Sequence, residues 1–332
     1  MTTETDHAPS TRLGRIYGYL SEMFPPAVVI PSGVASFAAM YFALQILGGA
    51  DALSIPWRAW FGAATVVLVM LLLRVYDELK DVETDLRLGR AGDPRYKDRA
   101  IVTGRIREDD LVALRWWVTG ALLAINAPLG AVPLIGFLVL FFVTWLSYHW
   151  FFWPAVGNNL LLAFATHNPM TLLLVAYVVA LYVQDFGAAG LSGGVVWLAL
   201  AMWLPMAAWE TSRKVRSPED ETEYQTYSKL LGWRVAGLLP AAFGVGGALC
   251  LIAVARMTAL PGLYAVVVAG SACLLAGACV RFLLRPSSES ANLKPFAEGF
   301  IFVSTVGLAA ALVYTYGFGE RGAADAIYIA LT

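Results

Sequence analysis

The sequence predicts an all-α, polytopic membrane protein with about nine transmembrane helices. Three observations support this fold class. The chain of 332 residues is 59% hydrophobic and only 14% charged, whereas soluble globular domains carry about 25% charged residues. Long apolar runs recur from one end of the chain to the other. The charged residues gather mainly in two polar stretches, which follow the second and the sixth apolar run.

Nine segments are apolar enough to span a bilayer, which takes about 20 helical residues. They are 26–48, 57–77, 110–129, 131–151, 158–183, 193–213, 233–255, 262–284 and 295–317. Pro169 lies inside the fifth segment, and we expect it to kink or partly unwind that helix, where the backbone faces protein or a cavity. We expect one transmembrane catalytic domain over 21–318, between short tails at 1–20 and 319–332.

Lys and Arg residues indicate which ends of these segments face the cytoplasm, because cytoplasmic loops are enriched in them. With the N-terminus inside, 20 of the 23 Lys and Arg residues fall on the inner side, and Arg58, Arg256 and Arg321 fall outside. We therefore expect an integral protein of the plasma (inner) membrane, with a cytoplasmic N-terminal tail, an extracytoplasmic C-terminal tail and both polar stretches in the cytoplasm. Besides the lipid bilayer, the sequence indicates no nucleic-acid partner and no obligate protein partner.

The first polar stretch carries an acidic row followed by a basic loop. Asp77, Asp81 and Asp85 are spaced by four residues, so they share one face if the helix continues. Three neighbouring carboxylates repel one another unless a cation lies between them, and Mg²⁺ is commonly held by carboxylates together with substrate phosphates. The cations that follow include Lys97, Arg99 and Arg105. A metal-loaded acidic row beside these cations suits a polyanion such as a diphosphate.

The second polar stretch, 209–233, has a similar layout: an acidic helix end, a basic loop and a turn of small residues. Two such loops at one end of a helical bundle would cap a cavity that opens toward the cytoplasm. Gly-rich phosphate-binding loops of the Walker type do not occur in the sequence, and neither do HExxH or CxxC motifs. These absences leave the two polar stretches as the main candidates for chemistry.

Three isolated polar residues inside or near the apolar segments favour structural roles. His149 and His167 lie near the ends of the fourth and fifth segments, where a lone histidine is more often a satisfied structural residue than a base. Glu298 lies inside the ninth segment, where a charge facing lipid is costly. We expect Glu298 to face the bundle and to pair with a basic group, and we favour this pairing over catalysis.

The motifs in the polar stretches resemble those of the UbiA superfamily of intramembrane prenyltransferases. DELKDVETD, which begins at Asp77, looks like the family's NDxxDxxxD signature, and RAIVTG, which begins at Arg99, resembles the RPIPSG that follows it. TYSKLLG, which begins at Thr226, is similar to the TLPxxxG after the second acidic motif. The similarity covers about residues 20–318. It implies an all-helical fold around a central cavity open laterally to lipid, with Mg²⁺ and the diphosphate of an isoprenoid donor held by two acidic motifs.

The sequence departs from this family pattern in three places. Asp77 replaces the leading Asn, which keeps an oxygen ligand and adds a charge. The second motif, usually DxxxD, runs here from Glu210 to Lys214, and a lysine contacts phosphate as a point charge but does not bind Mg²⁺. The next acidic residues, Glu219, Asp220 and Glu221, are therefore candidates for the missing ligand, and we include Asp220 among the expected metal ligands. Tyr148 stands where many relatives have a tyrosine followed by a basic pair, and the basic pair is absent here.

The resemblance implies a Mg²⁺-dependent intramembrane prenyltransferase that ionises an isoprenyl diphosphate and transfers the prenyl group to an acceptor. The expected catalytic residues are Asp77, Asp81, Asp85 and Tyr148; the diphosphate-binding residues are Lys97, Arg99, Arg105, Arg213 and Lys214; the metal ligands are Asp77, Asp81, Asp85, Glu210 and Asp220. Two alternatives remain. One is a terpene cyclase on the same fold, in which the substrate's own double bonds trap the cation. The other is a membrane transporter without enzymatic activity.

Overall fold

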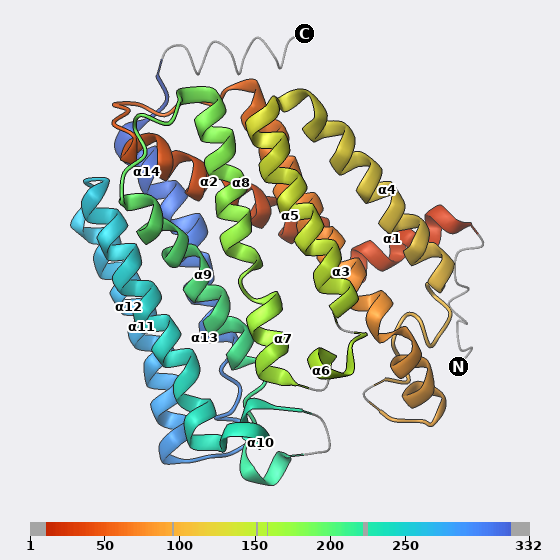
Figure 1. Cartoon of the computed structure of the whole chain (residues 1–332). Coiled ribbons are helices and arrows are strands. Elements are labelled where there is room, and N and C mark those ends of the chain that lie inside the picture. Colours follow the sequence, from red (N-terminus) through yellow and green to blue (C-terminus); the bar gives the residue numbers. More distant parts are fainter. Residues whose placement is uncertain (1–10, 95, 151, 158, 222–224, 320–332) are drawn as a thin grey trace, which may run out of the picture.

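The computed structural model describes residues 11–94, 96–150, 152–157, 159–221 and 225–319, and in this part of the chain helices are the regular structure (Figure 1). The longer helices are α1 (Arg12–Met23), α2 (Pro26–Leu47), α3 (Trp57–Arg90), α4 (Glu108–Asn126), α5 (Ala131–Trp150), α7 (Leu160–His167), α8 (Met170–Phe186), α9 (Gly194–Ser212), α11 (Trp233–Met257), α12 (Gly262–Leu284), α13 (Lys294–Phe302) and α14 (Leu308–Tyr316). The short ones are η1 (Ala127–Leu129), α6 (Pro154–Gly157), η2 (Pro218–Asp220), α10 (Tyr227–Leu231) and η3 (Val303–Gly307). Residues 1–10 and 320–332 of the two predicted tails lie outside the described part.

Nine segments of the described chain are long and apolar enough to cross a membrane, which confirms the predicted number. Large apolar side chains such as Leu263, Val266 and Leu274 are exposed on the outside of the bundle. A soluble protein rarely exposes contiguous apolar surface of this kind, so the surface suits lipid. The chain is an integral membrane protein.

Helix α3 is longer than the sequence analysis predicted, because it continues past Asp77 to Arg90. At 1.5 Å per residue, its 34 residues span about 50 Å, whereas the hydrocarbon core of a bilayer is about 30 Å thick. Pairs one turn apart, Arg74 with Glu78 and Lys80 with Asp77, support the charged part of the helix. The acidic row therefore lies on a helix that projects beyond the apolar core.

The fifth spanning segment is broken at Pro169, as predicted: α7 ends at His167 and α8 begins at Met170. Proline has no backbone N–H to donate, and its ring clashes with the preceding turn. The side chain of Asn168, inside the break, accepts a hydrogen bond of 2.7 Å from the indole N–H of Trp203 on α9. The break thus bends this segment, and Trp203 on the neighbouring helix α9 forms a hydrogen bond with a polar side chain inside the break.

The ninth spanning segment is also irregular, which the sequence analysis did not predict. It consists of α13, the π-helical turn η3 and α14. Single π-helical turns inside α-helices are rare and occur frequently at functional sites. Here the turn separates Glu298 on α13 from the last helix of the bundle.

The amphipathic helix α1, which contains the predicted tail boundary at residue 20, is fixed to the bundle by a buried ion pair. The guanidinium of Arg15 donates to both carboxylate oxygens of Asp110, at 2.7 and 2.8 Å, at the start of α4. At the opposite end of the bundle, Asp185 on α8 accepts from Tyr41 at 2.6 Å and pairs with Arg58 at 3.0 Å. These contacts join helices that are distant in sequence.

The connections after α3 and after α9 lie at the same end of the bundle, whereas α14 ends at the opposite end (Figure 1). The two polar stretches, which the sequence analysis placed on one side of the membrane, are thus together in space. Which side of the membrane this end faces stays a prediction.

Candidate active site

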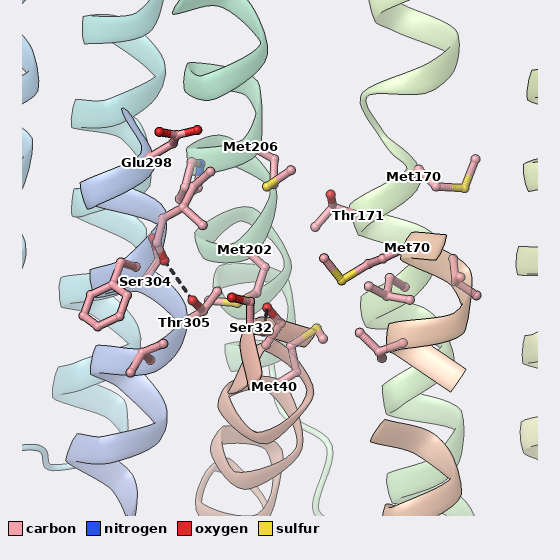
Figure 2. Close-up of a pocket in the computed structure, with 18 of the residues that line it drawn as sticks. Ser32, Met40, Met70, Met170, Thr171, Met202, Met206, Glu298, Ser304 and Thr305 are labelled. Atoms are coloured by element: carbon pink, nitrogen blue, oxygen red, sulfur yellow. Dashed lines mark hydrogen bonds between the residues drawn. The ribbon is translucent and has the colours of Figure 1, made fainter. Parts of the chain in front are cut away.

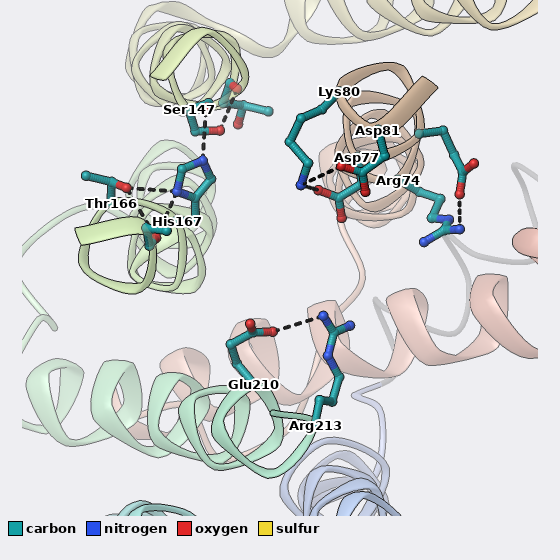
Figure 3. Close-up of polar contacts among 12 residues, drawn as sticks. Arg74, Asp77, Lys80, Asp81, Ser147, Thr166, His167, Glu210 and Arg213 are labelled. Carbon is teal, nitrogen blue, oxygen red and sulfur yellow. Dashed lines mark hydrogen bonds and ion pairs between the residues drawn. The ribbon is translucent and has the colours of Figure 1, made fainter. Parts of the chain in front are cut away.

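A layer of polar side chains occupies this end of the bundle, on the charged part of α3 and on the last turns of α7 and α9 (Figure 3). On α3 the carboxylates of Asp77 and Asp81 are about half exposed, at 56% and 48%. The ammonium group of Lys80 lies between them, with Nζ 3.2 Å from Asp77 Oδ1 and 3.9 Å from Asp81 Oδ1. Lys80 therefore partly neutralises a pair of carboxylates that would otherwise repel each other.

Asp85, the third member of the acidic row, does not share this exposed face. Its side chain is only 2% exposed and accepts a hydrogen bond from Arg99 in the basic loop. A step of four residues on a helix of 3.6 residues per turn rotates the side chain by about 40°. Over two steps this rotation carries Asp85 away from Asp77 and against the loop. A predicted metal ligand and a predicted diphosphate contact are thus paired with each other.

The second polar stretch presents Glu210, near the end of α9, toward the same space as Asp77 and Lys80 (Figure 3). Its carboxylate is 2.8 Å from Lys214 Nζ and 3.4 Å from Arg213 Nη2. The guanidinium of Arg213 also lies over the indole ring of Trp209. This cluster brings two of the predicted phosphate contacts to a predicted metal ligand, and it carries a net positive charge.

Asp220, proposed as a replacement metal ligand, is engaged elsewhere. Its carboxylate accepts hydrogen bonds from Ser217 and, at 2.6 Å, from Ser288 in the connection between α12 and α13. These hydrogen bonds stabilise the charged form and hold the pKa of Asp220 below its usual value. Asp220 thus links the second polar stretch to the connection between α12 and α13.

The remaining predicted site residues lie around the acidic row. Arg105 contacts Glu22 on α1 at 2.7 Å and the carbonyl oxygen of Asp98 at 2.7 Å. Lys97 is exposed in the same loop. The ring of Tyr148, at the end of α5, stacks on the ring of Tyr76, with centroids 4.6 Å apart. This stack places Tyr148 against α3, next to the residue that directly precedes Asp77.

His167, at the end of α7, is engaged by backbone carbonyls on both sides. Its Nε2 is 2.8 Å from the carbonyl oxygen of Ser147 on α5, and its Nδ1 is 2.8 Å from the carbonyl oxygen of Ala163. The ring faces the polar layer in Figure 3, but its nitrogens link α5 to α7. This geometry agrees with the structural role that the sequence favours for a lone histidine.

An apolar cavity of about 490 Å³ lies in the membrane-spanning part of the bundle (Figure 2). Its wall includes Leu73, one turn before Asp77, and Met206, one turn before Glu210. Five methionines contribute most of the flexible lining: Met40, Met70, Met170, Met202 and Met206. Methionine adapts to irregular apolar shapes, and pockets for small molecules have volumes of about 300–1,000 Å³. A charged layer is thus joined directly to a pocket for an apolar chain.

Mg²⁺ fits this donor set only together with a phosphate ligand. Within the described residues, no three His, Cys, Asp or Glu side chains converge as a metal-binding group. Asp77 and Asp81, however, expose carboxylate oxygens one turn apart on a helix. Mg²⁺ is usually bound through one or two carboxylates plus substrate phosphates and water, rather than by an all-protein cage. Two carboxylates are therefore sufficient when a diphosphate supplies further oxygens.

The helical arrangement resembles that of two solved structures of UbiA type. A UbiA homologue from Aeropyrum pernix K1 superimposes with a TM-score of 0.60 at 18% identity, covering 86% of this chain and 98% of the homologue. A digeranylgeranylglyceryl phosphate synthase superimposes with a TM-score of 0.55 at 14% identity, covering 90% and 99%. No protein-family profile and no curated protein matches the sequence. The structural likeness confirms the predicted fold.

Two features of the site were not predicted from the sequence: the position of Lys80 between two carboxylates, and the residues that line the expected cavity. Lys80 was counted only as an inner-side basic residue, although its position three residues after Asp77 and one before Asp81 is the signal for a cation between them. The cavity depends on residues from α2, α3, α8, α9, α13 and η3. No local sequence pattern indicates that residues from these separate elements come together around one cavity.

Proposed function

We propose that this protein is an intramembrane prenyltransferase that binds an isoprenyl diphosphate and transfers its prenyl group to an acceptor. One observation carries the proposal: a layer of carboxylates and cations directly adjoins an apolar cavity inside the membrane. An isoprenyl diphosphate has the complementary form, with an anionic head and an apolar tail. The fold shared with a digeranylgeranylglyceryl phosphate synthase adds support.

In this proposal the diphosphate lies between α3 and α9. Asp77 and Asp81 would hold Mg²⁺, which would supply positive charge to stabilise a departing diphosphate. Lys214 and Arg213 face the diphosphate from α9, while Lys80 reduces the repulsion between the two carboxylates. Asp85 and Arg99 act as a pair that fixes the basic loop to α3. The prenyl tail lies among the methionines of the cavity, where exclusion of water protects an allylic cation.

The two alternatives are less well supported by the cavity and the polar layer. Phe302 is the one aromatic side chain among the described residues that line the cavity, whereas aromatic faces stabilise the cations that a cyclase must guide. A cation transporter would need acidic groups along its path. Here Asp77, Asp81 and Glu210 lie at one end of the bundle, each beside a lysine.

The test is to incubate the purified protein with geranyl, farnesyl and geranylgeranyl diphosphate, with Mg²⁺, and first without an acceptor. We expect slow release of diphosphate with prenyl alcohol as the organic product, and faster consumption once a suitable acceptor is added. A cyclic hydrocarbon as the main product would favour the cyclase. Failure of all three diphosphates to bind would contradict both enzymatic functions.

A further inference from the structure

Glu298 is the one ionisable side chain in the described lining of the apolar cavity. It lies on α13, and Figure 2 shows it at the same end of the cavity as Met206 and Met170. Met206 is one turn before Glu210 on α9, and Met170 follows His167 after the helix break. Glu298 is therefore at the end of the cavity where the reacting carbon of a bound prenyl diphosphate would lie.

The surroundings of Glu298 hold one of its oxygens and leave the other open. Trp209 Nε1 and Lys294 Nζ both contact Oε1, each at 3.3 Å. Pairing with a basic group was predicted from the sequence, and the contact with Lys294 confirms it. Within the described part of the chain, these two contacts leave Oε2 free to accept a hydrogen bond from a ligand. The side chain is 49% exposed, which permits such contact.

The other polar groups of the cavity offer mainly hydrogen-bond acceptors. Five hydroxyl side chains line it, and four of them donate to a carbonyl oxygen of their own helix: Ser32, Ser36, Ser304 and Thr305. Ser304 and Thr305 reach the cavity from the π-helical turn η3. An anionic ligand would therefore meet a carboxylate and few available donors. A neutral ligand that carries a hydroxyl group would meet acceptors that suit it.

We propose that Glu298 is a catalytic residue that binds the acceptor, and that the acceptor is a neutral lipophilic hydroxyl compound rather than a carboxylic acid or a phosphate. This inference rests on the proposed prenyl transfer. The bond between the prenyl C1 and the diphosphate oxygen breaks, and its electron pair leaves with the diphosphate. A lone pair of the acceptor oxygen forms the new bond to C1. The proton of the acceptor hydroxyl passes to Glu298 Oε2.

Matched probes test the acceptor class: 2-naphthol, which has a neutral hydroxyl, and 2-naphthoate, which has the same ring system with a carboxylate. Their affinities are measured on the purified full chain with farnesyl thiolodiphosphate, an unreactive donor analogue, and Mg²⁺. We expect the parent to prefer 2-naphthol, and Glu298→Gln to weaken 2-naphthol binding by about ten-fold, the scale of a hydrogen bond to a charged group. The same substitution should strengthen 2-naphthoate binding. Glu289→Gln, which alters an exposed ion pair with Arg281, is the control and should change neither affinity.

Formation of farnesylated naphthol from farnesyl diphosphate tests the proton step. We expect Glu298→Gln to slow it by about 10²-fold, as for loss of a general base, while binding of farnesyl thiolodiphosphate is unchanged. The acceptor proposal is overturned if the parent prefers 2-naphthoate, if 2-naphthol does not bind saturably, or if Glu298→Gln leaves its affinity unaltered. The role as a base is overturned if the parent yields no farnesylated naphthol or if the variant matches its rate. If farnesyl thiolodiphosphate does not bind the parent, the proposed function itself is wrong.

Discussion

The carboxylate of Asp85 is buried and accepts a hydrogen bond from Arg99. This pair joins the end of the acidic row to the basic loop that follows α3. Both residues were predicted to contact the substrate or its metal. Because they contact each other, we expect this pair to support the site, while Asp77 and Asp81 face the space between α3 and α9.

Loss of Arg99 should therefore reduce stability. Arg99→Met leaves a buried carboxylate without its cationic donor, at a cost of about 1–3 kcal/mol in the free energy of unfolding. Thermal unfolding in detergent measures this change, and Arg87→Met, on the exposed side of α3, is the control. The double variant Asp85→Asn/Arg99→Met should be less destabilised than the sum of the two single variants. Simple additivity of the two changes would contradict the pairing.

Asp81 should be essential for turnover but not for folding. Asp81→Asn keeps the shape of the side chain and removes its charge, and loss of one such electrostatic contact commonly costs about 10²–10³ in rate. The fold should persist, because one of two neighbouring like charges is removed. Turnover of a prenyl diphosphate is compared with that of Glu83→Gln, an exposed residue on another face of α3. Turnover by Asp81→Asn close to the parental rate would remove Asp81 from the site.

Lys80 should weaken the affinity of the site for Mg²⁺. Its ammonium lies between the two carboxylates, and at about 4 Å a unit charge is worth about 1 kcal/mol even in water, or roughly five-fold in affinity. Lys80→Met should therefore tighten Mg²⁺ binding by about that factor. Titration calorimetry with Mg²⁺ and inorganic diphosphate measures it. Unchanged or weaker Mg²⁺ binding in the variant would show that Lys80 does not compete with the metal.

The second polar stretch should loosen at acidic pH because of Asp220. Hydrogen bonds from Ser217 and Ser288 lower its pKa in the folded protein below the unfolded value of about 3.9. Its contribution to stability is therefore complete above that value and is lost as the pH falls through the lower folded pKa. Relative to the intrinsic rate of amide exchange, which itself falls over this range, hydrogen exchange of the 217–221 segment should be slow at pH 5 and accelerate toward pH 3. In Asp220→Asn and Ser288→Ala this acceleration should be reduced, and identical profiles would refute the assignment.

The end of the bundle that carries both polar connections should face the cytoplasm. Glu219 is exposed at this end, and Ala188 is exposed in the connection between α8 and α9, at the other. In intact cells, an impermeant thiol reagent should label Ala188→Cys and leave Glu219→Cys unlabelled until the cells are opened. Labelling of Glu219→Cys alone in intact cells would reverse the orientation.

Much of the fold could be predicted because a bilayer imposes simple requirements on a sequence. A spanning helix must be about 20 residues long and apolar, since its backbone groups find partners only within the helix. Nine such segments were therefore visible, and Pro169 marked the break in the fifth. The residue at which α3 ends could not be predicted from hydropathy in the same way. The apolar run ends before Asp77, but Glu, Lys, Arg and Leu, which make up much of the following segment, form helices well, so α3 continues to Arg90.

The candidate site was predicted in composition but not in arrangement. The sequence by itself determined that carboxylates and cations gather at one end of the bundle, because residue type and spacing are local properties. Only the tertiary structure decided which distant partners meet: Asp85 with Arg99, Asp220 with Ser288, and Glu298 with a cavity built from six elements. The physical reason is that helix rotation and packing between distant segments set the direction of each side chain. A rotation of about 40° per four-residue step, taken twice, turns Asp85 away from the face of α3 that carries Asp77.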